Sequence, residues 1–138
     1  PLSFLNFLQI SKQVTQMNNE NEKIIGLLSK INAAQNEMIA AISHRSGHTA
    51  EDTAALLQLF DAGNTGRISA GLIPESLKKE SMVEIKADGS AVLTGKGAIA
   101  AKAMSISRER FSSQLLHGTT PEERFVLISV LEKMLKNI

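Results

Sequence analysis

Apolar residues recur at alternating intervals of three and four along the first third of the chain. The series runs from Phe7 to Ile42 without a slip, and Asn21 and Gln35 are its only polar members. This spacing is typical of a heptad seam, the apolar stripe along which one helix packs against another. The pattern therefore predicts a single helix from about Phe4 to Arg45, with no proline to interrupt it.

The length of this predicted helix has a consequence for assembly. It would extend about 60 Å at about 1.5 Å per residue. A compact monomer of 138 residues has a radius of gyration of only about 14 Å. The helix must therefore bend between Met17 and Glu22 or pack against a second chain, and we expect the second chain. Two ordinary core helices are the alternative. In the paired arrangement Asn21 and Gln35 would fix register and partner number, whereas in the alternative they mark a bend or an exposed stretch of the seam.

A second helix is predicted after Gly47. Thr49 is placed to cap it, and Gly63 and Asn64 are placed to end it. Its apolar face consists of four residues: Leu56, Leu57, Leu59 and Phe60. The segment from Gly66 to Ser81 then provides only a short helical region, with Pro74 near a helix start.

A β-hairpin is predicted next. Two runs with β character, residues 83–86 and 91–94, stand on either side of the turn signal Asp88-Gly89. The Gly-Lys-Gly sequence after Thr94 invites a phosphate-loop interpretation, but the preceding glycine framework of such a loop is absent. A turn into the start of a helix is the expected structure.

Two helices complete the chain, separated by Gly118. Thr120, Pro121 and Glu123 stand at the offsets of an N-cap, a first-turn proline and a capping-box acid. The last helix, expected from Pro121 to Asn137, is apolar on more than one face. Such a helix must be buried on several sides, so we expect a partner chain to cover it.

Composition excludes several classes of protein. Hydrophobic residues make up 43% of the chain, which is enough for the core of one domain. The absence of cysteine excludes disulfides, thiolate metal sites and thiol catalysis. The N-terminal segment lacks the features of a signal peptide, and no uncharged apolar run is long enough to span a bilayer. We therefore expect a soluble cytoplasmic protein that does not contact a membrane.

One stretch, residues 60–72, allows a calcium-binding interpretation. Asp61 and Gly66 stand at the first and sixth places of a calcium loop, with Thr65 and Ser69 at further ligand places. However, glycine at the third place offers no side-chain ligand, and Leu72 stands where a bidentate glutamate is needed. One carboxylate cannot hold calcium tightly, so we expect no calcium site and instead a short strand around residue 68.

Other catalytic and metal patterns are weak. His44 and His48 lie four residues apart, but Gly47 between them ends the predicted helix, and His117 is remote. The sequence contains no Ser/His/Asp order and no pattern of paired carboxylates. We expect neither an enzyme nor a bound metal or cofactor.

The last third of the chain resembles a known family. "VLTGKGAIAAKA" is similar to the strand and helix start of the form LTxKG in MarR/SlyA-family regulators, and "LLHGTTPEERFVLISVLEKMLKNI" resembles their loop and last helix. The order of elements extends the resemblance back to Gly47. It implies a mainly α fold with a small β-hairpin, a MarR-like winged helix whose long N-terminal helix and C-terminal helices form an intertwined homodimer. It also implies transcription regulation, with DNA held by the wing and the recognition helix and released in many members by small organic ligands.

The central segment departs from that family. Between Phe60 and Val92 the chain is shorter than the family by more than a helix, and residues 76–85 resemble the end of the recognition helix and the first wing strand. The family's wing carries an Asp-x-Arg motif, whereas Asp88 is followed by Gly89 and Ser90. From Asp61 to Gly97 five cationic side chains are balanced by five anionic ones, and DNA-binding surfaces are normally basic.

These patterns divide the chain into three regions. They are a long dimerisation helix or coiled coil over residues 1–46, a shortened winged-helix region with a hairpin wing over residues 47–97, and C-terminal dimerisation helices over residues 98–138. The candidate DNA contacts are Ser76, Lys78, Lys79, Lys86, Asp88 and Gly89. The candidate dimer contacts are Phe7, Ile10, Val14, Met17, Ile24, Leu28, Ile31, Phe125, Ile128, Leu131, Leu135 and Ile138. We expect a dimeric MarR-like transcriptional regulator that binds double-stranded DNA. The alternative is a homologue without DNA binding that acts by protein–protein association, as an antagonist or adaptor.

Overall fold

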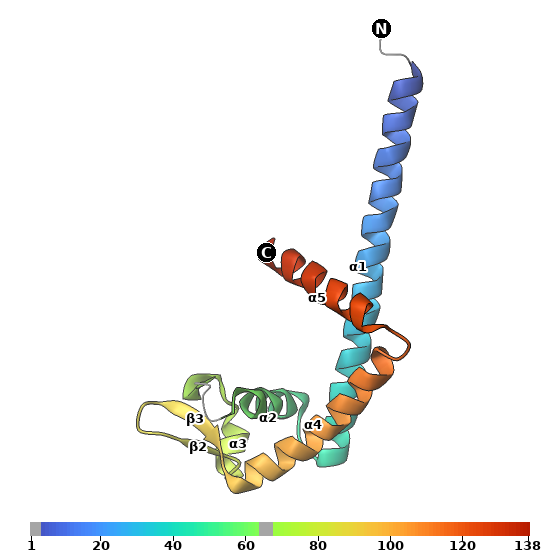
Figure 1. Cartoon of the computed structure of the whole chain (residues 1–138). Coiled ribbons are helices and arrows are strands. Elements are labelled where there is room, and N and C mark those ends of the chain that lie inside the picture. The colour runs from blue at the N-terminus through green and yellow to red at the C-terminus, as the bar shows by residue number, and fades with distance from the viewer. Residues whose placement is uncertain (1–3, 64–67) are drawn as a thin grey trace. The chain divides into compact units, whose positions relative to one another are not determined.

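The computed structural model of the chain describes residues 4–63 and 68–138 (Figure 1). The elements follow in the order α1 (Phe4–Ser46), α2 (Ala50–Ala62), β1 (Ile68–Ser69), the 3-10 helix η1 (Ala70–Leu72), α3 (Glu75–Lys79), β2 (Val83–Ile85), β3 (Ser90–Leu93), α4 (Gly95–Leu115) and α5 (Pro121–Lys136). The chain divides into two compact units, Pro1–Ala54 and Ala55–Ile138. This order confirms the predicted fold class, mainly helical with a small hairpin.

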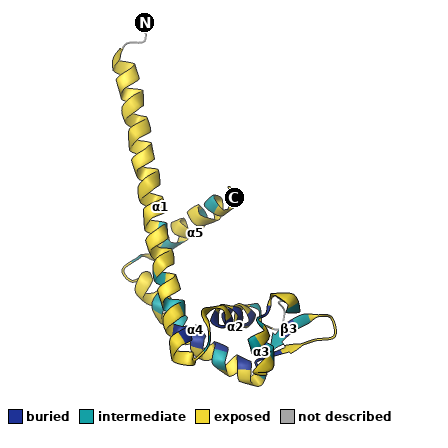
Figure 2. Cartoon of the chain, turned by 180° about the vertical axis from the view of Figure 1, so that it is seen from behind, coloured by how far each residue is buried: buried dark blue, intermediate teal, exposed yellow. Residues whose placement is uncertain are grey.

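α1 is one helix, as the heptad pattern predicts. It continues through residues 17–22, where a bend would have separated two core helices. Every residue from position 4 to position 27 is exposed (Figure 2). Full burial is confined to the end of the helix, at Ile42 and Ser43. The first half of α1 therefore carries an apolar seam that the single chain leaves open to solvent.

Buried hydroxyl groups join the end of α1 to the start of α2. Ser43 Oγ lies 2.8 Å from Thr53 Oγ1, and the two hydroxyls also bond to the carbonyl oxygens of Ile39 and Thr49 at 2.7 and 2.9 Å. Two hydroxyl hydrogens serve these three contacts, so they must be shared among them. Thr49 Oγ1 accepts the backbone N–H of Asp52 at 3.0 Å and caps α2, as predicted.

Three short strands form an antiparallel sheet in the order β1-β3-β2. β2 pairs with β3 from Val83 opposite Leu93 to Ile85 opposite Ala91, which confirms the predicted hairpin. α3 packs on β2, and α4 packs on β3. The buried apolar residues of this unit are Ala55, Leu56, Leu57, Leu59, Ile73, Leu77, Met82, Val83, Ala91, Ala101 and Met104.

Phe60 differs from the prediction for α2. The three leucines of the predicted apolar face are buried, but Phe60 is 36% exposed. It lies in the last turn of the helix, just before Gly63, whose positive φ of 58° ends α2. There it lines a hollow of about 240 Å³ together with residues of β3 and the start of α4. Leu59, its neighbour in the same turn, is buried, so the two side chains point to different sides of α2 and the ring of Phe60 remains at the surface.

Candidate nucleic-acid interface

α3 is the segment that the sequence resemblance places at the end of a recognition helix. It contains five residues, Glu75–Lys79, and at about 1.5 Å per residue it rises only about 7.5 Å. Pro74 stands at its N-cap, without a side-chain cap hydrogen bond. Between α2 and β2 the described residues contain no other α-helix. In the part of the chain described, α3 therefore lacks the exposed turns with which a recognition helix reaches base edges.

The side chains of α3 divide between the core and the surface. Leu77 is fully buried and holds the helix in place. Lys78 is half-buried, and its Nζ lies 3.4 Å from Glu75 Oε2. Lys79 is exposed, and Ser76 is half-buried. α3 therefore offers two cations to a ligand, and one of them is already paired with a carboxylate.

The end of the hairpin is shaped by Asp88 and Gly89. The Gly89 N–H donates to the Lys86 carbonyl at 2.9 Å, and the Lys86 N–H donates to the Ser90 carbonyl at 2.8 Å. Gly89 has a φ of 83°, in the left-handed region that a bulged hairpin turn requires. The Asp88 carboxylate accepts the N–H and the hydroxyl of Ser90 at 2.9 and 2.5 Å. Asp88 and Gly89 thus form the turn, and Lys86 is its exposed cation.

Thr94 and Lys96 hold the turn that follows α3. The Thr94 hydroxyl accepts the N–H of Gly97 at 3.1 Å, which caps α4, and it donates to the Ser81 carbonyl at 2.6 Å. Lys96 Nζ donates to the Glu80 carbonyl at 3.0 Å. The predicted turn into a helix start is therefore confirmed. The lysine that suggested a phosphate loop is bound to the protein's own backbone.

Gly97 brings α4 close to the same turn. A Cβ at this position would lie 2.0 Å from the carbonyl oxygen of Met82 and 2.9 Å from its carbonyl carbon. The same oxygen accepts the N–H of Thr94 at 3.1 Å. Only glycine permits this approach. Sequence reasoning noted Gly97 within the "LTGKG" resemblance but missed the contact, because a backbone carbonyl partner leaves no signal in the sequence.

An ion pair joins the end of α2 to the middle of α4. Arg108 Nη1 and Nη2 donate to Asp61 Oδ2 and Oδ1 at 2.8 and 2.6 Å, a bidentate arrangement. The hydrogen bond from Arg108 lowers the pKa of Asp61 below its ordinary value, and the same bond raises the pKa of Arg108. The pair is 47 residues apart in the chain, so no local pattern predicts it.

The calcium-binding interpretation of residues 60–72 depends on Asp61 and on the residues that follow it. Asp61, the first place of the calcium pattern, lies in the last turn of α2, and the structure pairs it with Arg108. Asn64, Thr65 and Gly66 lie outside the described residues. Within residues 4–63 and 68–138, no three His, Cys, Asp or Glu side chains are placed to hold a metal ion. None of the helices described there has the length and apolarity needed to cross a membrane.

Comparison with known proteins gives a match in structure. No family model matches the chain, and no curated protein matches it. A MarR-family transcriptional regulator from Silicibacter pomeroyi is 19% identical, with a TM-score of 0.65 over 81% of this chain and 87% of the other. A second from the same organism is 20% identical, with a TM-score of 0.61 over 88% and 96%. The transcription regulator MarR from Oenococcus oeni PSU-1 is 15% identical, with a TM-score of 0.61 over 81% and 98%. The chain has the MarR-like winged-helix fold.

The wing of this MarR-like fold and its shortened α3 carry no excess of positive charge. Between positions 75 and 90, three lysines are accompanied by four carboxylates. A surface that binds nucleic acid is normally basic, because neutralising phosphates supplies most of the affinity. Lys79 and Lys86 are the exposed cations among the candidate DNA contacts. Any contact with phosphate in this region must therefore depend on these few side chains.

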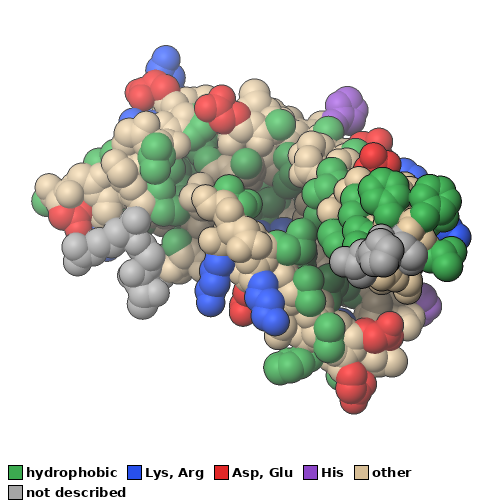
Figure 3. All heavy atoms as spheres, turned by 90° about the horizontal axis from the view of Figure 1, so that it is seen from above, with side chains coloured by type: hydrophobic (Ala, Val, Ile, Leu, Met, Phe, Trp, Pro, Cys, Tyr) green, Lys and Arg blue, Asp and Glu red, His purple; other side chains and the backbone are tan. Residues whose placement is uncertain are grey.

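The predicted dimer contacts of this MarR-like chain lie on α1 and α5, except Ile138, which follows α5. Phe7 is 67% exposed and Ile10 60%, while Phe125 is 72% exposed and Leu135 70%. Leu28 is half-buried. The other candidates are also exposed: Val14, Met17, Ile24, Ile31, Ile128, Leu131 and Ile138. Figure 3 shows hydrophobic side chains reaching the surface on one face of the molecule.

α5 begins as the sequence predicts. The Thr120 hydroxyl accepts the N–H of Glu123 at 3.1 Å, and the Glu123 carboxylate accepts the N–H of Thr120 at 3.0 Å. Pro121 occupies the first turn. None of the residues of α5 is buried. The helix is therefore well formed at its start, yet its apolar faces are uncovered within the single chain.

Proposed function

We propose that this chain is a homodimeric transcriptional regulator that binds double-stranded DNA through α3 and the hairpin. The observation that carries the proposal is the MarR-like fold, since the similar solved structures are described as MarR-family transcriptional regulators. The short sheet, the hairpin and the capped start of α4 form the winged region that such a function uses. The lysines of α3 and the hairpin supply the cations.

Exposed apolar surface supports the homodimer. Soluble monomers rarely expose large continuous apolar patches, yet α5 exposes Phe125, Val126, Leu127, Ile128, Val130, Leu131 and Leu135. Burying one such side chain completely contributes about 1.5–3 kcal/mol. A second copy of the chain would bring an identical surface, and a two-fold interface of this kind is the commonest form of oligomer. Burial of the exposed apolar side chains of α1 and α5 by a second copy therefore favours association of two chains.

Phosphate contacts account for the proposed DNA binding better than base contacts do. Lys78, Lys79 and Lys86, with the Ser76 hydroxyl, are suited to phosphate oxygens, which position a protein without specifying a sequence. α3 is too short to place several side chains on base edges. Each neutralised phosphate contributes about −0.9 to the slope of log affinity against log salt, so three lysines in each of two chains correspond to about −5. We expect salt-sensitive binding with little sequence preference.

A second function is favoured by two observations. α3 has only five residues, and the charges between positions 75 and 90 are three lysines with four carboxylates. A chain with this fold and without DNA binding would act by protein–protein association, as an antagonist or adaptor. In that case the exposed apolar surfaces would serve another protein as well as a second copy.

Anisotropy of a fluorescent duplex, titrated at low and at rising salt, tests the first function. We expect binding that weakens with salt, and a slope smaller by about 3–4 in the double variant Lys79→Gln/Lys86→Gln. Lys30→Gln, on α1, is the matched control and should leave the slope unchanged. A folded dimer that shows no duplex affinity even at low salt supports the second function. Light scattering should give about twice the chain mass of 14.9 kDa, and the mass of a single chain would refute the homodimer.

A further inference from the structure

We infer that residues 4–27 of α1 pair with the same residues of a second copy as a parallel, in-register, two-stranded coiled coil. This stretch is exposed along its whole length. An isolated helix gains most of its stability from packing an apolar face, so a helix with a regular seam and no cover requires a partner. The coiled coil rests on the proposed homodimer and adds to it the orientation, the register and the number of the helices.

The seam occupies two positions of the heptad. If Phe7 is taken as position a, the residues at a are Phe7, Val14, Asn21, Leu28, Gln35 and Ile42. The residues at d are Ile10, Met17, Ile24, Ile31 and Met38. Side chains at these spacings lie on one side of a helix. Val14 is 50% exposed and Met17 58%, although both belong to this apolar side.

Charged residues avoid the seam and its borders. Between positions 4 and 43 five of the six charged residues take the outer heptad positions b, c and f, and only Glu20 borders the seam. In a parallel pair a residue at position g lies beside position e of the other helix, and opposite charges at these positions select the partner. Because Glu20 is the only charge at these positions, the borders of the seam do not select a different chain, and they allow the segment to pair with itself.

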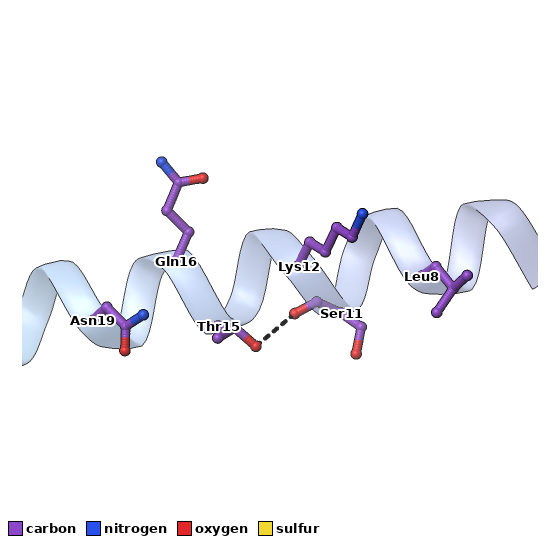
Figure 4. Close-up of a pocket in the computed structure, with 6 residues that line it drawn as sticks. All are labelled: Leu8, Ser11, Lys12, Thr15, Gln16 and Asn19. Carbon is purple, nitrogen blue, oxygen red and sulfur yellow. Dashed lines mark hydrogen bonds between the residues drawn. The ribbon is translucent and has the colours of Figure 1, made fainter.

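The outer face of the same stretch is polar, as Figure 4 shows. Lys12, Gln16 and Asn19 project from it, and the Thr15 hydroxyl donates to the Ser11 carbonyl at 3.0 Å. These residues take heptad positions b, c, e and f, outside the a and d seam. Leu5 and Leu8 also take outer positions and would stay exposed in a two-stranded coil. The polar outer face would remain in water while the seam is buried.

The polar residue of the seam within residues 4–27 determines the orientation of the two helices. Asn21 occupies position a, and the d residues of this stretch, Ile10, Met17 and Ile24, are apolar. In an antiparallel pair each a residue lies opposite a d residue, so the amide of Asn21 would face an apolar side chain. A buried polar group without a partner costs about 1–3 kcal/mol. In a parallel pair Asn21 lies beside Asn21 of the second copy, and the amides can bond to each other.

Asn21 also limits the number of helices. Within residues 4–27, Val14 at position a favours two strands. A single asparagine at position a specifies the two-stranded state at some cost in stability. Asn21→Leu should therefore raise the mass above that of a dimer in light scattering and raise the melting temperature. An unchanged dimer mass would show that Asn21 does not specify the two-stranded state.

Single cysteines test the orientation directly, since the chain contains none of its own. A disulfide needs Cα atoms within about 7 Å. In the parallel coil Ile10→Cys lies opposite its copy and should cross-link in high yield under diamide. In an antiparallel overlap of the whole helix, the two copies would be about 45 Å apart at about 1.5 Å per residue. Lys12→Cys, two residues away on the outer face, is the control and should cross-link poorly.

The outcomes separate the coiled coil from the proposed homodimer. High yield for Ile10→Cys and low yield for Lys12→Cys supports the parallel coil. Equal yields, or no cross-link from either variant, refute it. If the wild-type chain has the mass of a dimer and Ile10→Cys fails to cross-link, the homodimer is supported and the parallel coiled coil is refuted. If the wild-type chain has the mass of one chain, both proposals are refuted. Circular dichroism of each variant serves to check that the helix is retained.

Discussion

Gly97→Ala tests the close approach of α4 to the turn after α3. The added methyl group would lie 2.0 Å from the carbonyl oxygen of Met82, 2.9 Å from its carbonyl carbon and 3.2 Å from Leu93 Cδ2. A C–H carbon and a carbonyl oxygen usually come no closer than about 3.3 Å in favourable contacts. The start of α4 and the backbone at Met82 must therefore move apart by more than about 1 Å.

The expected cost follows from this displacement. Overpacking of a close contact destabilises a protein by about 1–3 kcal/mol. The movement also strains three hydrogen bonds, which run from Thr94 and Lys96 to the carbonyls of residues 80–82. Each contributes about 0.5–1.5 kcal/mol. Alanine is favoured over glycine inside a helix by about 1 kcal/mol, which offsets part of the cost. We expect a net loss of about 2–4 kcal/mol in the free energy of unfolding.

Urea unfolding followed by circular dichroism measures this loss, at one protein concentration because association changes apparent stability. Gly95→Ala is the matched control. It lies two residues earlier in the same helix, and a Cβ there meets no atom within 4 Å. We expect the control to change stability by no more than about 1 kcal/mol. If the two variants unfold at the same urea concentration, the close approach is absent in solution and the reasoning is wrong.

Three further predictions concern single side chains. Leu77→Ala removes the buried anchor of α3 and should cost about 2–5 kcal/mol in urea unfolding, whereas Lys79→Ala on the exposed side should change less than about 0.5 kcal/mol; similar losses would contradict the burial of Leu77. Thr120→Ala removes the capping box and should lower the free energy of unfolding by about 1 kcal/mol, and unchanged stability would show that α5 does not depend on this cap. Asp61→Asn removes the ion pair with Arg108. Because the folded pKa of Asp61 is lowered, the pair stabilises the protein above the unfolded pKa of about 3.9, and its contribution is lost as pH falls through the folded pKa. Since both side chains are partly exposed, we expect wild type and variant to differ by less than about 1 kcal/mol at neutral pH and to converge in acid; a difference that persists in acid would contradict the assignment.

Local signals predicted most elements of the fold. The capping box of Thr120 and Glu123 and the turn at Asp88-Gly89 each depend on residues within a few positions, so the sequence shows them directly. The heptad series predicted α1 because a helix repeats its contacts along its length. The length of the central segment also predicted a reduced α3, since too few residues remain there for a full recognition helix.

Contacts between distant segments could not be predicted in this way. Asp61 and Arg108 belong to different helices, and neither has a neighbour that marks the other. Gly97 meets a carbonyl, a group that every residue carries. The exposure of Phe60 depends on which side of α2 the core covers, and the run of apolar residues in the sequence does not show that side. For the candidate DNA contacts, the residue types indicated charge, but only the structure shows which lysine is already paired.

The contacts that hold the turn after α3 affect which substitutions the exposed side of α3 can accept. Thr94 and Lys96 bond to carbonyl oxygens of the turn after α3, and Gly97 packs against another carbonyl. These contacts do not depend on which side chains α3 displays. Lys78 and Lys79 can therefore be exchanged for acidic, aromatic or apolar residues without loosening the helix from its support. The exposed side chains of α3 can thus change by substitution while the contacts that hold the turn behind it are kept.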